Sequence, residues 1–424
     1  MPPFMKLSKH GTRMAGFLAA TRNEIATDEM FLKLVSLSPA RVGYLPRVPK
    51  WITLGRKSPG LTKLCSLAGA LLWIAGGAPL LFLRQYLQCR GRTPAVAAPA
   101  ARGAGAVLAL SSRTGDILAA PQFAHLPRLW ITMPWAPLRG LPAGACAIDV
   151  HALLSRAELR ACFVDALRAT GLMLRRPSTR PWVLQSYTAF RWFCVRRAVD
   201  KLLPGHLVMT EHYDRWAILA DDAVGARRRA DRDASALTLV QHGSLGGLGG
   251  DGAQAAPALG LHRRLRSVTS LYAYGAAAER AFRAGILGPP HRLPGLRVTY
   301  FKPAIRLAAR DAAAGLAILF VGHPLAEPLH VAVYGLLRQT RPFTAYYKPH
   351  PMAPMSDAMR HVGWTIVDDS GSFPAVDLLV SYESTLVVEY AGEGVPAEVH
   401  PINMPPERAG DYVERVRRRL PGHV

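Results

Sequence analysis

The chain has 424 residues, half of them apolar, so it is long enough for two or three domains and too apolar to be disordered as a whole. It carries 52 Lys and Arg against 29 Asp and Glu, and the net charge of +23 points to anionic partners: a membrane surface, phosphorylated substrates or nucleic acid. Its five cysteines are an odd number without a CxxC pair, which argues against a disulfide framework and against a zinc site.

Residues 1–92 form a basic N-terminal region that differs from the rest of the chain. They contain 14 Lys and Arg but three acidic residues, and residues 64–83 form an uncharged apolar run between Lys63 and Arg84. The run is long enough to cross a bilayer, although two glycines and a proline interrupt it. Three interpretations stay open: an anchor embedded in or lying on a membrane, a buried helix of the globular fold, and a true single span. The basic flanks favour contact with anionic lipid.

Residues 93–105 are rich in Ala, Pro and Gly and are predicted to be a linker. An α/β domain is predicted over residues 106–287, because short apolar runs alternate with longer mixed apolar and basic runs. The predicted strands are AVLAL, LWITM, HLVMT, ALTLV and SLYAY, beginning at residues 106, 129, 206, 236 and 270. The predicted helices cover residues 153–174, 182–203, 216–230 and 276–284.

Polar residues directly follow two of these strands. Glu211 and His212 come after HLVMT, and His242 comes after ALTLV, within Gln-His-Gly. Ligands of open parallel sheets bind outside the carboxyl ends of the strands. Glu211, His212 and His242 are therefore expected to face a ligand.

Residues 288–298 contain three prolines and are predicted to be an interdomain hinge, and a second α/β domain is predicted over residues 299–424. Its first strand, AILFV, ends at Gly322 and His323, and a helix over 326–338 follows. A last strand begins at residue 397, and a basic helix over 407–420 is expected to cross back onto the first domain.

The stretch from residue 343 to 396 repeats the pattern of an apolar run that ends in polar residues. TAYY stops at Lys348 and His350, and VDLLV stops at a segment that contains Ser381, Ser384 and Thr385. A short helix, LVVEYAGEG, then begins. Small hydroxyls at the start of a helix suit a phosphate, because free N–H groups and the helix dipole point at it. The same hydroxyls would also serve as plain N-caps.

Between about residue 205 and residue 403 the chain resembles bacterial GT-B transferases of surface polysaccharides. These are the capsule sialyl- and polysialyltransferases, the capsule Kdo transferases and the teichoic-acid glycerophosphotransferases. The matching segments are QHG at 241–243, KPHP at 348–351, which is similar to a His-Pro motif, and SYESTLVVEYAGEGVP at 381–396, which is similar to a Ser/Thr motif ahead of a helix. The acidic motif of the sialyltransferases has only a partial match at 250–252.

The resemblance implies two facing Rossmann-like domains of the GT-B type, with the acceptor on the first domain and the nucleotide-sugar donor on the second. His350 would then stabilise the departing phosphate, while Glu211, His212 or His242 would take the proton of the acceptor hydroxyl. Residues expected to bind the donor are Lys348, Ser381, Ser384, Thr385, Glu389, Gly322 and His323.

The expected activity is that of a metal-independent glycosyltransferase that holds no bound cofactor and uses a nucleotide sugar, CMP-linked or other, as donor. The expected partners are that donor, a glycan or glycolipid acceptor, and the inner face of the membrane in the cytoplasm. Nucleic acid is not expected, because the positive charge follows no known nucleic-acid motif. A D-x-D match at 231–233 precedes a strand instead of ending one, so no metal is expected. The alternatives are a polyol-phosphate transferase of the teichoic-acid type and a catalytically degenerate GT-B module that binds glycan.

Overall fold

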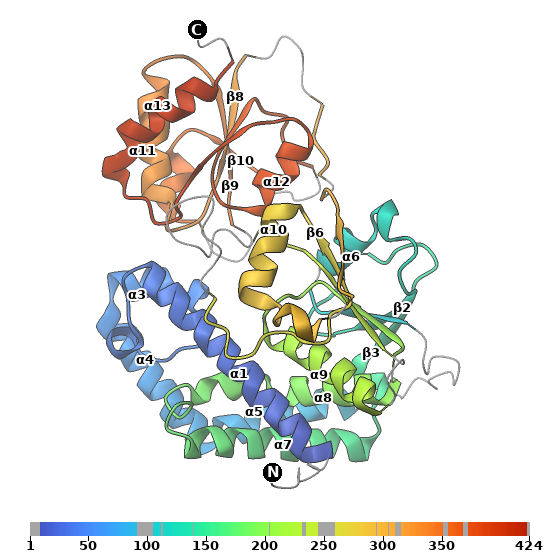
Figure 1. The fold of residues 1–424 in the computed structure, drawn as a ribbon. Helices are drawn as coiled ribbons and strands as arrows, with labels where there is room; N and C mark the ends of the chain where they lie inside the picture. Colours follow the sequence, from blue (N-terminus) through green and yellow to red (C-terminus); the bar gives the residue numbers. More distant parts are fainter. Residues whose placement is uncertain are drawn as a thin grey trace.

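The computed structural model of the protein describes residues 9–90, 105–111, 113–138, 140–202, 204–230, 235–244, 259–293, 295–303, 305–309, 315–350, 355–367 and 372–421. These parts of the chain build two β-sheets of parallel strands, each flanked by helices (Figure 1). The predicted fold class of two facing Rossmann-like α/β domains is confirmed.

The first sheet has seven strands in the order β3-β2-β1-β4-β5-β6-β7. They are β1 (Ala106–Ala109), β2 (Leu129–Thr132), β3 (Cys146–Asp149), β4 (His206–Met209), β5 (Ala236–Val240), β6 (Ser270–Ala273) and β7 (Arg297–Tyr300). The second sheet has five strands in the order β10-β9-β8-β11-β12. They are β8 (Ala317–Val321), β9 (Thr344–Lys348), β10 (Thr365–Ile366), β11 (Leu378–Tyr382) and β12 (Ala397–His400).

In both sheets the strand order reverses at one point. The chain adds strands to one side of β1 and then continues from β4 on its other side, and the second sheet does the same between β8 and β11. The crevice at such a switch point is where open α/β sheets bind ligands. The residues that follow β1, β4, β8 and β11 are therefore the first candidates for a ligand-binding site.

The N-terminal region is not a separate unit, contrary to its predicted boundary at residue 92. Helix α1 (Lys9–Leu34) packs on α9 (Arg215–Ala230), and it also contacts α7 (Arg156–Arg175) and α8 (Ala189–Leu202). Its Phe17 is fully buried against Trp192 of α8, with ring centroids 5.6 Å apart. The basic composition of this region led to the prediction of a separate unit, but the inner side of α1 completes the core of the first domain.

The predicted hinge at 288–298 is also corrected. β7 pairs in parallel with β6, in the register Ser270 with Arg297, so the chain leaves the first sheet only after Tyr300. β7 is an edge strand with exposed residues and a charged first position, so its sequence lacks the apolar run that marks the central strands.

The basic C-terminal helix does not cross back onto the first domain. α13 (Ala409–Arg419) packs on α11 (Glu327–Arg338) of the second domain. Tyr412, Val413 and Val416 lie in the core of that domain, and the arginines stay on the outer side of the helix.

The apolar run of the N-terminal region forms one long, kinked helical segment. It consists of α4 (Pro59–Leu72), a π-helical turn η2 (Trp73–Gly77) and α5 (Ala78–Arg90), and it is long and apolar enough to cross a membrane. The backbone leaves helical values at Gly76. Most of its large apolar side chains are exposed, so the interpretation as a buried core helix is wrong.

Candidate functional site

The carboxyl ends of the two sheets meet at a junction that two polar contacts cross. The backbone N–H of Ser244, after β5, donates to Oγ1 of Thr385 at the start of α12 (Thr385–Gly392), at 3.1 Å. Nη2 of Arg113, after β1, lies 3.6 Å from Oε1 of Glu389 on α12. These contacts bring the switch points of the two sheets against each other.

On the first domain the junction contains a cavity of about 130 Å³. The residues that line it are Glu211, His212, Tyr213, Asp214, His242, Gly243 and Ser244. Three sequence-predicted residues, Glu211, His212 and His242, are thus brought together. Asp214 was missed, although it stands three residues after Glu211 and directly ahead of a helix.

The His212 and His242 rings are in contact, and their hydrogen bonds determine which ring nitrogens carry a proton. Nε2 of His212 accepts the backbone N–H of His242 at 3.1 Å, so this nitrogen carries no proton. Nδ1 of His242 donates to the carbonyl of Thr210, which leaves its Nε2 as the basic nitrogen. Burial lowers the pKa of His242 to about 4 and holds the pKa of His212 well below its ordinary value. Both rings are therefore neutral at pH 7.

Glu211 and Asp214 form a pair of interacting carboxyls. Burial raises the pKa of Glu211 to about 7, while a hydrogen bond with the Asp214 side chain opposes that rise. Burial and the Glu211 charge also raise the pKa of Asp214. Oδ1 of Asp214 accepts the N–H groups of Trp216 and Ala217 at 2.9 and 3.0 Å and so caps α9. Because each negative charge disfavours the other, two interacting buried carboxyls hold a proton more tightly than two exposed ones.

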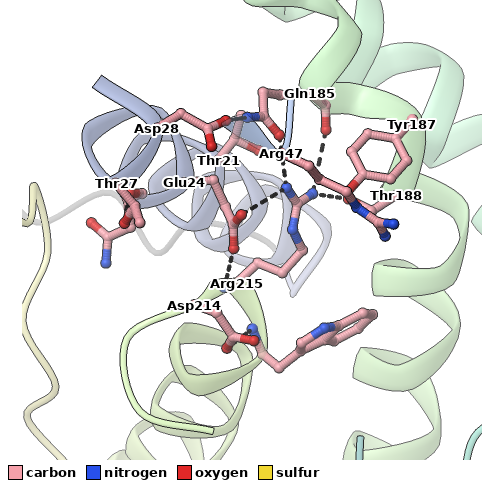
Figure 2. A network of polar contacts seen from close by, with 12 residues as sticks. Thr21, Glu24, Thr27, Asp28, Arg47, Gln185, Tyr187, Thr188, Asp214 and Arg215 are labelled. Atoms are coloured by element: carbon pink, nitrogen blue, oxygen red, sulfur yellow. Dashed lines mark hydrogen bonds and ion pairs between the residues drawn. The ribbon is translucent and has the colours of Figure 1, made fainter. Parts of the chain in front are cut away.

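A buried arginine, Arg215, ties the start of α9, next to Asp214, to α1 (Figure 2). The backbone N–H of Arg215 donates to Oε1 of Glu24 at 3.0 Å, and its Nη2 lies 3.4 Å from Oε2 of the same residue. The guanidinium also donates to the side chains of Gln185 and Thr188. Gln185 in turn donates to Asp28 of α1. The strand-end segment that carries Glu211 is thereby fastened to α1.

On the second domain, His350 and His323 face each other with ring centroids 5.2 Å apart. Burial lowers the pKa of both, and it brings that of His323 to about 3. Nδ1 of His323 accepts the N–H of Leu325 at 3.2 Å, which fixes that ring at the end of β8. The nearby charge of Arg113 lowers the pKa of His350 further, so this ring lies within electrostatic reach of the first domain.

The first N–H groups of α12 donate no hydrogen bond to the side chain of the N-cap residue. Ser384 occupies the N-cap position but makes no side-chain cap hydrogen bond. Its hydroxyl instead pairs with that of the buried Ser381, at 3.1 Å. The predicted alternative that Ser384 is a plain N-cap is therefore wrong, and Thr385 is engaged by Ser244 across the junction.

Two further sequence-predicted residues have local partners. Lys348 Nζ donates to the carbonyl of Val367 at 2.9 Å and lies over the Phe373 ring. A Cβ at Gly322 would come within 2.2 Å of the Tyr347 ring, so this glycine leaves room for that ring just after β8. Their predicted role in donor binding stays a prediction.

Arg113 is a second residue of the junction that sequence reasoning overlooked. It pairs with the buried Glu389, and its charge acts on His242 and His350 on opposite sides of the junction. Its only sequence signal is its place three residues after AVLAL. Glu389, whose pKa burial raises, is held by this cation.

Several sequence-predicted features lie outside the described residues: the D-x-D at 231–233, the partial acidic motif at 250–252 and the last proline of KPHP. In the parts of the chain that the structure does describe, no group of three or more His, Cys, Asp and Glu side chains is arranged to hold a metal ion.

No protein-family model matches the sequence, and no curated protein matches it. Among solved structures, the chain is similar to a UDP-GlcNAc 2-epimerase from Neisseria meningitidis bound to UDP-GlcNAc, with 9% identity, a TM-score of 0.42, and coverage of 74% of this chain and 90% of that one. It is also similar to a lipopolysaccharide outer core galactosyltransferase, WaaB, with 12% identity, a TM-score of 0.38 and coverage of 75% and 90%. The wall teichoic acid polymerase TagF matches with 10% identity, a TM-score of 0.36 and coverage of 80% and 78%.

Proposed function

We propose that this protein is a glycosyltransferase of the GT-B type that moves a sugar from a nucleotide-activated donor to a surface polysaccharide or lipid-linked glycan, without a required metal ion. The observation that carries the proposal is the junction itself. A buried carboxyl pair at one switch point faces a set of anion-binding groups at the other, and Ser244–Thr385 and Arg113–Glu389 join the two.

Glu211 is the general base of the proposed reaction. A base works best when its pKa lies near the working pH, and burial brings the pKa of Glu211 to about 7, whereas that of His242 is about 4. The acceptor hydroxyl would give its proton to the Glu211–Asp214 pair as its oxygen bonds to the sugar. The neutral Nε2 of His242 would accept a hydrogen bond from the acceptor and orient it.

The bond from the sugar to the donor phosphate breaks in the same step, so negative charge grows on the phosphate. Arg113, the His350 ring and the first N–H groups of α12 are the groups that would stabilise it. A hydroxyl that accepts one hydrogen bond keeps its own hydrogen, so Thr385 would donate to the phosphate while Ser244 still bonds to it. Glu389 would hold a ribose hydroxyl of the donor once Arg113 turns to the phosphate.

The resemblance to capsule sialyl- and Kdo transferases favours a CMP-linked donor, and the basic, apolar N-terminal region favours work at the cytoplasmic face of a membrane. Donor choice is tested first by binding. Thermal shifts of the full-length protein with CMP, UDP, GDP and CDP should single out one nucleotide, and Ser384→Ala/Thr385→Ala should lose that shift.

Turnover is tested with labelled CMP-, UDP- and GDP-sugars, and with CDP-glycerol, offered together with oligosaccharide and glycolipid acceptors. Transfer of a labelled sugar that persists in EDTA and fails in Glu211→Gln is the expected result. Transfer of glycerol phosphate would replace the proposal by a polyol-phosphate transferase. Nucleotide binding without any transfer would leave a glycan-binding module in its place.

A further inference from the structure

In the helical segment of α4, η2 and α5, most of the large apolar side chains face outward, whereas an ordinary surface helix turns them toward the core. In α4 the buried side chains are Thr62 and Ser66, and the leucines point outward. Of the fifteen large apolar side chains exposed in the described chain, ten lie between residues 54 and 87. They are Leu54, Leu61, Leu64, Leu67, Leu71, Leu72, Ile74, Leu80, Leu83 and Leu87, called the leucine face below.

The inner side of the same segment is fastened to the first domain along its length. The Ser66 hydroxyl accepts the N–H of Tyr44 at 2.7 Å, and the Trp73 indole donates to the Ser186 hydroxyl at 2.9 Å. Phe82 and Cys89 are buried in the main core of the domain. A helix that crossed a bilayer would have to give up these contacts and place Thr62 and Ser66 in lipid. The segment therefore stays on the protein with only its outer side available.

The positive charge around the leucine face indicates what kind of partner binds it. The sequence contains no Asp or Glu between Glu29 and Asp116. The exposed charges on α3 (Ile52–Lys57), α4 and α5 are all cationic: Arg56, Lys57, Lys63, Arg84 and Arg90. A second copy of the chain seated on this face would bring like charges together. An anionic lipid surface offers hydrocarbon for the leucines and headgroup charge for the cations.

We propose that the leucine face inserts into an anionic bilayer leaflet with α4 and α5 lying in the membrane plane, so that the protein is monotopic. Figure 1 places α4 and α5 on the first domain, away from the second sheet. This inference gives the form of the membrane contact in the proposed function, but its test measures binding alone and does not depend on turnover.

Native cysteines supply the probe and its control. Cys65 lies exposed on α4 beside Leu64, while Cys146 is exposed on β3, and the other three cysteines are buried. The full-length chain with Cys146→Ser would be labelled at Cys65 with an environment-sensitive fluorophore, and the matched control, Cys65→Ser, would be labelled at Cys146. With vesicles of phosphatidylcholine and phosphatidylglycerol, the Cys65 probe should shift to the blue and the Cys146 probe should not. No shift at Cys65 would overturn the proposal.

The depth of two probes in the bilayer distinguishes a helix that lies in the membrane plane from one that spans the membrane. Ile74 is 52% exposed at the kink, so Ile74→Cys in a background of Cys65→Ser and Cys146→Ser supplies a second probe. Lipid-borne quenchers at graded depths should place both probes at the same shallow depth. A probe at residue 74 near the bilayer centre, with residue 65 near the headgroups, would mean a span and would overturn the in-plane inference.

Two sets of substitutions test the driving forces. Leu64→Gln/Leu67→Gln/Leu71→Gln should lower partitioning into the anionic vesicles at least tenfold, and Lys63→Gln/Arg84→Gln should lower it roughly tenfold at low salt. Nucleotide-induced thermal shifts should be unchanged in both, which separates failure of docking from failure of the proposed function. Unchanged partitioning, or a dimer in sedimentation experiments that the leucine substitutions dissolve, would assign the face to another occupant.

Discussion

The two switch points that meet at the junction are built in opposite ways. On the first sheet, Glu211 and Asp214 are buried carboxyls whose positions depend on Arg215 and on Glu24 of α1, a helix almost two hundred residues away in sequence. On the second sheet, Ser384 at the start of α12 bonds to Ser381 of β11, three residues before it.

The difference follows from the chemistry of each side. A carboxyl whose pKa is near 7 must be taken out of water, and burying it is costly unless fixed partners surround it. An anion site needs only donors that point outward, and the start of a helix supplies these from the backbone. The first side therefore draws on distant parts of the chain, whereas the donors that open α12 come from residues next to it in sequence.

The largest expected effect comes from replacing Glu211, the proposed base. Glu211→Gln keeps the size and a hydrogen bond of the side chain but cannot take a proton, so turnover should fall by about a hundredfold to ten-thousandfold. Nucleotide affinity should change less than about threefold, since the proposed donor site lies on the other sheet. Initial rates and calorimetry with the cognate nucleotide measure the two. Equal losses of affinity and turnover would contradict the division between the sheets.

Removal of the buried arginine tests whether the first side depends on α1. Arg215→Met leaves Glu24 and the surrounding amides without their cation, and the loss of one partner from a buried pair costs about 3 kcal/mol of unfolding free energy. Urea unfolding followed by circular dichroism gives the value. The control is Arg408→Met, whose exposed pair with Asp411 on α13 should contribute well under about 1 kcal/mol. Similar losses of unfolding free energy in both variants would show that the Arg215 network stabilises the protein no more than an exposed ion pair does.

The local character of the second side predicts a smaller and separate effect. Ser384→Ala/Thr385→Ala removes two hydroxyls at the start of α12, so nucleotide binding should weaken by about tenfold to a hundredfold with the fold intact. Calorimetry measures the affinity, and His350→Ala is the comparison, because it should reduce turnover more than binding. Wild-type nucleotide affinity in the double variant would place the donor elsewhere.

The same contrast explains what the sequence could and could not predict. Most of the buried strands and the polar residues after them were predicted, because a short apolar run and the residues that follow it are neighbours in the chain. Asp214 and Arg113 were missed, because their importance comes from what the fold brings against them: Glu24 beside the first pair and Glu389 across the junction. β7 was missed because an exposed edge strand lacks an apolar run.

The pKa of Glu211 also predicts how turnover depends on pH. Since burial raises the pKa of Glu211 to about 7, this proposed base would be mostly protonated and inactive below that value. Turnover should therefore rise about tenfold between roughly pH 6 and pH 8 and then level off, with a midpoint near 7. A midpoint near 4 would instead assign the base to His242, whose pKa is lowered to about that value.

Stability should move in the opposite direction. The folded protein binds the Glu211 proton more tightly than the unfolded chain, whose glutamates have a pKa of about 4.5. The contribution is fully present below about pH 4.5 and is lost as the pH rises through about 7, so this residue lowers the unfolding free energy over that range. In Glu211→Gln the fall should be shallower, as measured by urea unfolding at several pH values. If the variant and the parent protein show the same pH dependence of stability, Glu211 has an ordinary carboxyl pKa, and the proton must be taken by another group at the junction.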